Sequence, residues 1–175
     1  DQDTPLVLNL RGKDVLLAET RQLRAVAAPD LTVRYAAGSP LQVTGKITIS
    51  EADINLERLD QGVSTSPDVV VLDPVDPDRN APSALDLDLE LVMGDAVNLK
   101  GFGLTGTLGG HLRVRAPPGR GMRATGALDI GGRYSAYGQR LQITRGRLLW
   151  ANTLIGDPRL DIRAERVVGA VTAGI

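Results

Sequence analysis

A strict alternation of leucine with acidic residues runs from Leu85 to Leu91, and this pattern constrains the fold more than any other part of the sequence. Successive side chains of a β-strand point to opposite faces, so the four leucines share one surface and the three carboxylates share the other. The same two-residue period returns in four later segments, at residues 111–115, 128–130, 141–144 and 160–163. The repeated pattern predicts an all-β chain whose strands form one elongated antiparallel sheet with an apolar face.

Strand and turn signals also cover the rest of the chain. Strands are expected at 6–10, 15–17, 31–35 and 41–49, with a turn at 11–14 and a break at 38–40. Residues 16–26 also fit a short amphipathic helical turn. Near the C-terminus, residues 131–143 are expected to form two strands joined by a turn at Gly138. They are followed by a strand at 148–150, a turn at 156–158, a strand at 160–164 and a last strand from near Val167.

Two related copies of one segment occur in the chain, offset by 81 residues. When residues 6–49 are aligned without gaps on residues 87–130, twelve of the forty-four pairs are identical, about four times the chance expectation. Most identities fall at positions expected to face inward, such as Leu31 with Leu112. We therefore predict a repeat of about 81 residues that stacks along a single domain spanning 1–175, cut from a longer array.

The segment between the two copies, residues 73–83, contains three prolines and several Asp and Asn residues. Proline cannot donate to a strand ladder, and this composition cannot pack, so we expect a long, exposed, flexible loop. Asp76, Asp78 and Asn80 imitate the start of a calcium-binding loop. However, Ala81 and Leu87 stand where such a loop needs glycine and a bidentate glutamate. We interpret the segment as a solvated acidic loop and expect no metal.

Charge and composition exclude several classes of function. The net charge is −1, from 20 basic and 21 acidic residues, so no basic field attracts nucleic acid. Aromatic residues make up only 3% of the chain, too few for binding by base stacking. Cysteine is absent, which excludes thiolate metal sites, disulfides and thiol catalysis. We expect neither a nucleic-acid partner nor a cofactor.

The segment from Gly101 to Gly106 matches the Gly-x-Gly-x-x-Gly nucleotide fingerprint. That fingerprint works because a helix follows the third glycine and directs amides at a pyrophosphate. Here a strand pattern follows, so the glycines are interpreted as bends or close approaches in a curled sheet.

Possible catalytic residues are few. Asp86, Asp88 and Glu90 lie about 7 Å apart along one strand face, as an acid and base pair of a glycosidase would. The aromatic platforms of a sugar cleft are missing, and arginines on adjoining strands are available as partners. A charged outer face is therefore the better interpretation. His111 is the only histidine, and no Gly-x-Ser-x-Gly nucleophile motif accompanies it. We expect no enzymatic activity.

Three aromatic residues, Tyr134, Tyr137 and Trp150, gather in the C-terminal part of the sequence. We expect them to pack and form hydrogen bonds at corners or ends of the sheet, with ligand contact as the alternative.

Residues 94–114 and 132–150 strongly resemble the C-terminal domain of the TamB family. The resemblance is dense from about Leu85 to Ile162, and looser but in register before that. Its most specific part is a Gly-x-Tyr-x-x-Tyr-Gly hairpin, whose defining residues here are Gly132, Tyr134, Tyr137 and Gly138. TamB proteins are inner-membrane-anchored subunits of the translocation and assembly module that span the periplasm of Gram-negative bacteria.

The resemblance implies a sheet folded lengthwise, a β-taco, with an apolar concave interior open along one side. TamB-like proteins are thought to carry phospholipid between the inner and outer membranes. They are also thought to act with the outer-membrane barrel TamA in inserting barrel proteins. The terminal residues resemble cuts through a longer protein. We therefore expect the N-terminal membrane anchor and the final strands that meet TamA to lie outside the fragment.

The alternating apolar residues are the candidate contacts for lipid or for a client protein. They are Leu85, Leu87, Leu89, Leu91, Leu104, Leu108, Leu112, Val114, Leu128, Ile130, Leu141, Ile143, Leu148, Leu160 and Ile162. Two alternatives stay open at this point. The same residues can interdigitate into a dry core, which alternation alone does not distinguish from a groove. A groove with an exposed edge can also act as a chaperone that binds β-strands of unfolded outer-membrane proteins.

Overall fold

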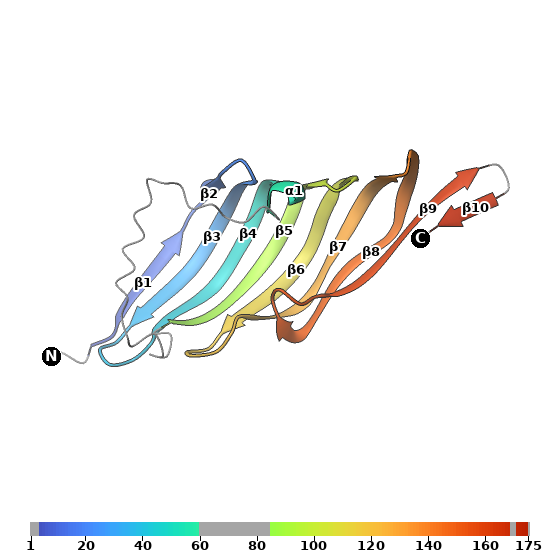
Figure 1. Cartoon of the computed structure of the whole chain (residues 1–175). Coiled ribbons are helices and arrows are strands. Elements are labelled where there is room, and N and C mark those ends of the chain that lie inside the picture. The colour runs from blue at the N-terminus through green and yellow to red at the C-terminus, as the bar shows by residue number, and fades with distance from the viewer. Residues whose placement is uncertain (1–3, 60–84, 169–170, 175) are drawn as a thin grey trace.

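The computed structural model describes residues 4–59, 85–168 and 171–174, which form ten strands and one short helix (Figure 1). The first half contains β1 (Leu6–Arg11), β2 (Val15–Glu19), β3 (Leu23–Tyr35), β4 (Leu41–Asn55) and α1 (Leu56–Leu59). The second half contains β5 (Leu85–Gly101), β6 (Leu104–Ala116), β7 (Arg123–Ala136), β8 (Gln139–Leu154), β9 (Arg159–Val168) and β10 (Val171–Gly174). The predicted loop at 73–83 lies outside the described residues.

All ten strands belong to one curled, mostly open sheet in the order β1-β3-β4-β5-β6-β7-β8-β9-β10. The strand β2 continues the edge formed by β1, because both pair with β3. Neighbouring strands are antiparallel, as predicted, with one exception: β4 and β5 run parallel, from Leu41 beside Leu85 to Asn55 beside Lys100. Parallel neighbours need a long crossover connection, and residues 56–84 supply the length for it.

Three local predictions were wrong. The strand expected at 148–150 is not separate from the one that ends at 143, because β8 runs through both segments. Residues 16–26 do not form a helical turn: β2 ends at Glu19, and β3 begins at Leu23. Thr20 Oγ1 accepts a hydrogen bond from Leu23 N over 3.0 Å, so a tight turn joins two strands here. The last strand begins at Val171 rather than near Val167, because β9 continues to Val168.

The hairpin turns explain several glycines. Tyr137 and Gly138 both have positive φ angles, 51° and 73°, and they alone connect β7 to β8. Phe102 and Gly103, at 51° and 84°, connect β5 to β6 in the same way. Two-residue loops with positive φ at both positions match the twist of the flanking strands. The turn predicted at Gly138 is confirmed. Gly106 lies within the strand β6, whereas a nucleotide site would need a helix to begin there.

One face of the sheet, here called the inner face, carries the buried hydrophobic side chains. Two clusters form there. The first joins Leu112, Val114, Ala124, Leu128 and Trp150. The second joins Ala25, Ala52 and Val97 near the other end of the central strands. No buried polar or charged residue occurs in the described part of the chain, as expected for a sheet that separates apolar and charged side chains by strand parity.

The outer face carries cross-strand ion pairs. Arg113 pairs with Asp88, Arg147 with Asp129, and Arg11 with Asp30, with nitrogen–oxygen distances of 2.7, 3.1 and 3.1 Å. All three pairs join neighbouring strands. The predicted charged outer face, with arginines opposite the carboxylates, is confirmed at these positions.

Candidate functional site

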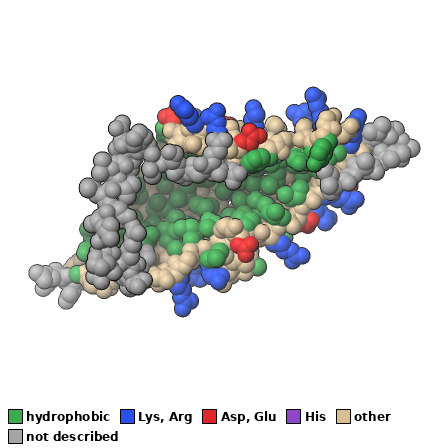
Figure 2. All heavy atoms as spheres, in the orientation of Figure 1, with side chains coloured by type: hydrophobic (Ala, Val, Ile, Leu, Met, Phe, Trp, Pro, Cys, Tyr) green, Lys and Arg blue, Asp and Glu red, His purple; other side chains and the backbone are tan. Residues whose placement is uncertain are grey.

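A trough runs along the inner face (Figure 2). Hydrophobic side chains gather in its hollow, while lysine and arginine side chains project along its two rims. The separation follows from strand geometry, because each strand alternates an inward apolar residue with an outward polar one.

The strand ladder places all fifteen candidate residues on the inner face. Leu89 lies beside Val114, Leu108 beside Ile130, and Leu128 beside Leu148. Their exposure differs. Leu112, Val114, Leu128 and Leu141 are buried, and Leu85, Leu160 and Ile162 are exposed. The remaining residues are half-buried: Leu87, Leu89, Leu91, Leu104, Leu108, Ile130, Ile143 and Leu148.

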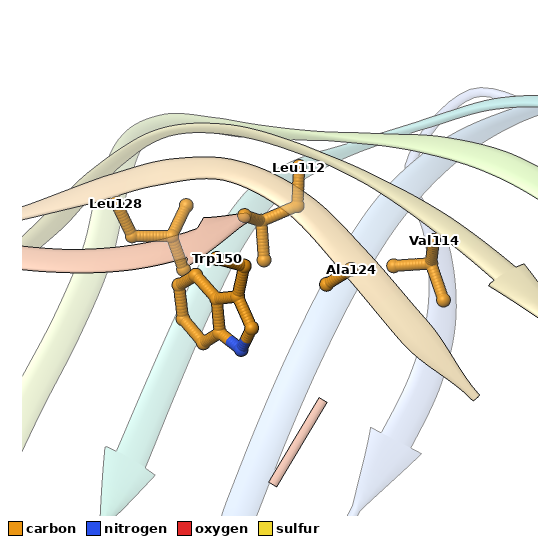
Figure 3. Packing of buried hydrophobic residues seen from close by; sticks show 5 residues of the cluster. All are labelled: Leu112, Val114, Ala124, Leu128 and Trp150. Carbon is orange, nitrogen blue, oxygen red and sulfur yellow. The ribbon is translucent and has the colours of Figure 1, made fainter. Parts of the chain in front are cut away.

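Three of the four buried candidates, Leu112, Val114 and Leu128, belong to one packed cluster (Figure 3). Trp150 of β8 lies with Leu112 of β6 and Leu128 of β7, and Val114 packs in the same cluster. Trp150 Nε1 donates a hydrogen bond to the carbonyl of Ile155 over 3.0 Å, which fixes the ring toward the turn after β8. Part of the predicted groove is therefore dry core, and the packing role predicted for Trp150 fits this position.

An apolar pocket of about 440 Å³ opens at the end of the inner face where the β5–β6 turn lies. Its lining joins five strands or their turns to α1: Leu56, Gly101, Phe102, Leu104, Ile130, Tyr134, Ile143, Ile162 and Ala164. The volume lies within the range of small-molecule pockets, and the lining is apolar, as such pockets usually are. Four of the fifteen candidate residues meet here.

The short helix α1 forms one wall of this pocket. Glu57 Oε1 accepts a hydrogen bond from the backbone N–H of Phe102 over 2.7 Å, which fixes α1 to the β5–β6 turn. Gly101 permits the close approach, because a Cβ there would lie 2.9 Å from the backbone nitrogen of Glu57. The sequence pattern missed Leu56 and Phe102. A four-residue helix has no visible period, and Phe102 stands in a turn.

The hairpin residues divide into two kinds. Tyr134 lines the pocket, whereas Tyr137 is fully exposed at the turn beside Gly138. Gly132 has a φ of 131°, and a Cβ there would lie 2.3 Å from the carbonyl oxygen of Thr105. The two glycines therefore shape the hairpin, and one of the two tyrosines reaches the apolar pocket.

On the outer face, the structure brings Asp88, Glu90 and His111 together with Arg113 around one pocket. Asp88 accepts hydrogen bonds from Arg113, and its pKa lies below the ordinary value chiefly because of that hydrogen bond, helped by the charges of Arg113 and Arg115. A carboxylate held ionised in this way serves as an ion-pair partner. Within the same part of the chain, no three His, Cys, Asp or Glu side chains come together as metal ligands. None of the described helices has the length and apolar character to cross a bilayer.

The chain matches a known protein family. The family model described as "TamB C-terminal domain" matches residues 1–175, the whole of the chain. The match includes the residues of the trough and the pocket, and it agrees with the resemblance seen in the sequence.

Proposed function

The chain belongs to the TamB C-terminal domain family, and we propose that it acts as a periplasmic conduit that carries phospholipid acyl chains between the inner and outer membranes. The family supplies non-enzymatic components of the translocation and assembly module, in the envelope of Gram-negative bacteria. Family membership thus gives the cellular setting, and the lipid cargo is our inference from the trough.

One observation carries the proposal: an apolar pocket of about 440 Å³ continues a row of half-buried aliphatic residues along the inner face. Exposing a 16-carbon acyl chain to water costs on the order of 10 kcal/mol, at about 0.8 kcal/mol per methylene. An apolar trough removes most of that cost without binding the chain more tightly than a bilayer does. Transfer along the trough therefore does not trap the lipid.

The proposal includes the repeat of about 81 residues, with copies at 6–49 and 87–130 in one domain. Strand registers support it. Leu31 pairs with Gly45 between β3 and β4, and Leu112 pairs with Gly126 between β6 and β7. Each residue of the second pair stands 81 positions after its counterpart in the first. Gly45 and Gly126 share positive φ angles of 138° and 131°. A repeated unit provides a way to lengthen a trough toward the distance between two membranes.

Client-strand chaperoning is the second candidate function, in cooperation with TamA. It is favoured by the apolar residues that β1 leaves exposed at the edge of the sheet, because a visiting β-strand can add to such an edge and lay its apolar side chains along the trough. The partner surface for TamA is expected in parts of the protein outside this chain.

A pair of adjacent residues on β8 tests the conduit. Ile143 lines the pocket on the inner face, and Gln142 is exposed on the outer face. We expect Ile143→Arg to abolish cross-linking of a photoreactive phospholipid, because the guanidinium occupies the apolar pocket. Gln142→Arg should leave cross-linking unchanged while adding the same charge. Circular dichroism checks that both variants keep the sheet.

Equal lipid capture by Ile143→Arg and the unsubstituted chain would count against the conduit. Equal loss with Gln142→Arg would show that added charge, rather than the pocket, controls capture. Mass spectrometry of hydrophobic molecules that co-purify with the chain then identifies the cargo.

A further inference from the structure

The edge formed by β1 and β2 exposes a group of large apolar side chains. Leu6, Leu8 and Leu10 are 66%, 53% and 46% exposed, although their register with β3 places them on the inner face beside Tyr35, Val33 and Leu31. Among the described residues, β1 and β2 pair with no strand on their outer side. An exposed apolar face beside an unpaired strand edge is typical of a site where another strand binds.

In the second half of the chain, the residues equivalent to Leu6, Leu8 and Leu10 have a strand on both sides. Leu87, Leu89 and Leu91 of β5 pair with Ala116, Val114 and Leu112 of β6. This is the register in which β1 pairs with β3, with every residue number increased by 81. These three leucines are half-buried rather than exposed. On the other side of β5, the strand β4 runs parallel to it and pairs with the same three leucines.

The correspondence between the β1–β2 edge and β5 extends beyond the point where each of them is interrupted. The strand β4 pairs with residues 85–93 of β5, skips two residues, and resumes at 96–100. Shifted by 81, these ranges become 4–12 and 15–19, and the second is the whole of β2. The interruption between β1 and β2 therefore falls where the pairing between β4 and β5 is itself interrupted.

We infer that the β1–β2 edge receives one further polypeptide strand, which runs parallel to β1 and carries apolar residues in the phase of β4. A strand in the position of β4 places its equivalent of Val43 beside Leu6 and its equivalent of Ile47 beside Leu10. It lies beside the exposed leucines, as β4 lies beside Leu87 and Leu91, and extends the inner face by one strand. The inference concerns the edge of the sheet and holds whether or not the trough carries lipid.

One position in the edge differs from its equivalent. A Cβ at Gly94 would lie 2.7 Å from the carbonyl oxygen of Ile49, so β4 approaches β5 closely there. Lys13 occupies the equivalent place at the edge. The incoming strand therefore stands further from residue 13 than β4 stands from Gly94, and its pairing divides into one segment on β1 and another on β2.

A peptide with the sequence of β4, Leu41–Asn55, is the probe. Added to the whole chain, it should slow amide hydrogen exchange in β1 and β2 by roughly tenfold or more, because their outward amides gain partners. A nitroxide on the peptide N-terminus should broaden the resonances of residues near Leu6. The same label on the peptide C-terminus should broaden those near Glu19, because the strands are parallel.

Two matched controls sharpen the test. A peptide whose apolar and polar positions are exchanged should protect the edge much less. In the protein, Leu8→Arg should weaken peptide binding, whereas Val7→Arg should not, because Val7 pairs with Arg34 on the outer face. Absence of protection in β1 and β2 would overturn the inference, and so would the reversed broadening pattern. Neither result bears on cross-linking of lipid in the pocket.

Discussion

Asp88 of β5 accepts two hydrogen bonds from a single guanidinium, that of Arg113 on β6, over 2.9 and 2.7 Å. The two residues lie diagonally across the β5–β6 ladder, because Asp88 pairs in register with Arg115. The paired geometry stabilises the ionised carboxylate, and the pKa of Asp88 falls below its ordinary value of 3.8.

This pair predicts an acid-sensitive contribution to stability. When the folded-state pKa of a carboxyl group lies below its unfolded value, the unfolded chain binds more protons as the pH falls. The contribution of Asp88 is therefore complete above about pH 4 and is lost as the pH falls through the folded-state pKa. We expect Asp88→Asn to lower the free energy of unfolding at pH 7 and to lower it less at pH 3. Urea titrations at both values measure the difference, and a gap that widens toward pH 3 would refute this.

Removal of the Trp150 side chain should cost about 3–5 kcal/mol of unfolding free energy, the usual range for a buried aromatic replaced by alanine. The ring is 7% exposed and packs against Leu112 and Leu128. Trp150→Phe keeps most of the packing and loses only the hydrogen bond to Ile155, so its cost should be near 1 kcal/mol. Circular dichroism follows unfolding in both variants. Equal costs would assign the effect to the hydrogen bond.

Adjacent glycines in β7 should differ sharply in their tolerance of alanine. At Gly132 the φ angle is 131°, and a new Cβ would lie 2.3 Å from Thr105 O. Backbone strain of this kind costs about 1–3 kcal/mol before the clash is added. At Gly131 the nearest atom to a new Cβ is Thr107 Oγ1, at 3.8 Å. Thermal unfolding should show a large loss of stability for Gly132→Ala and a small change for Gly131→Ala; similar losses would contradict the geometry.

Tyr137→Asn should stabilise the β7–β8 hairpin by about 0.5–1 kcal/mol. The tyrosine has a φ of 51° and is fully exposed, so its side chain makes no packing contribution that the substitution removes. Asn tolerates the left-handed region better than Tyr, and Asn-Gly is a preferred pair for this turn. Tyr137→Val should destabilise, because a β-branched residue suits positive φ poorly. Chemical denaturation measures both changes, and the opposite order would be inconsistent with the turn.

Much of the fold followed from strand parity in the sequence. The alternation from Leu85 to Leu91 predicted β5 and its two faces, and the ladder places Leu89 beside Val114 as that parity requires. The turn at Gly138 followed from local composition. Family resemblance rested on residues that the structure places in the β7–β8 hairpin and the apolar pocket.

Other features depend on contacts distant in sequence. The parallel pairing of β4 with β5 leaves no local mark, because alternation is the same in either direction. Parity also does not separate a buried leucine such as Leu112 from a half-buried one such as Leu104, since both face inward and differ only in what packs above them. The wall supplied by Leu56 requires a four-residue helix to meet a turn forty-five residues away.

The lone parallel pairing also bears on how the chain reaches its native state. On either side of it, the strands from β2 to β4 and from β5 to β10 follow one another through short hairpins, so each half can form by closing small loops. Joining Leu41 to Leu85 instead closes a loop of forty-four residues, and contacts of long sequence separation slow folding. We therefore expect formation of the β4–β5 pairing to limit the folding rate, after each half has formed its local hairpins.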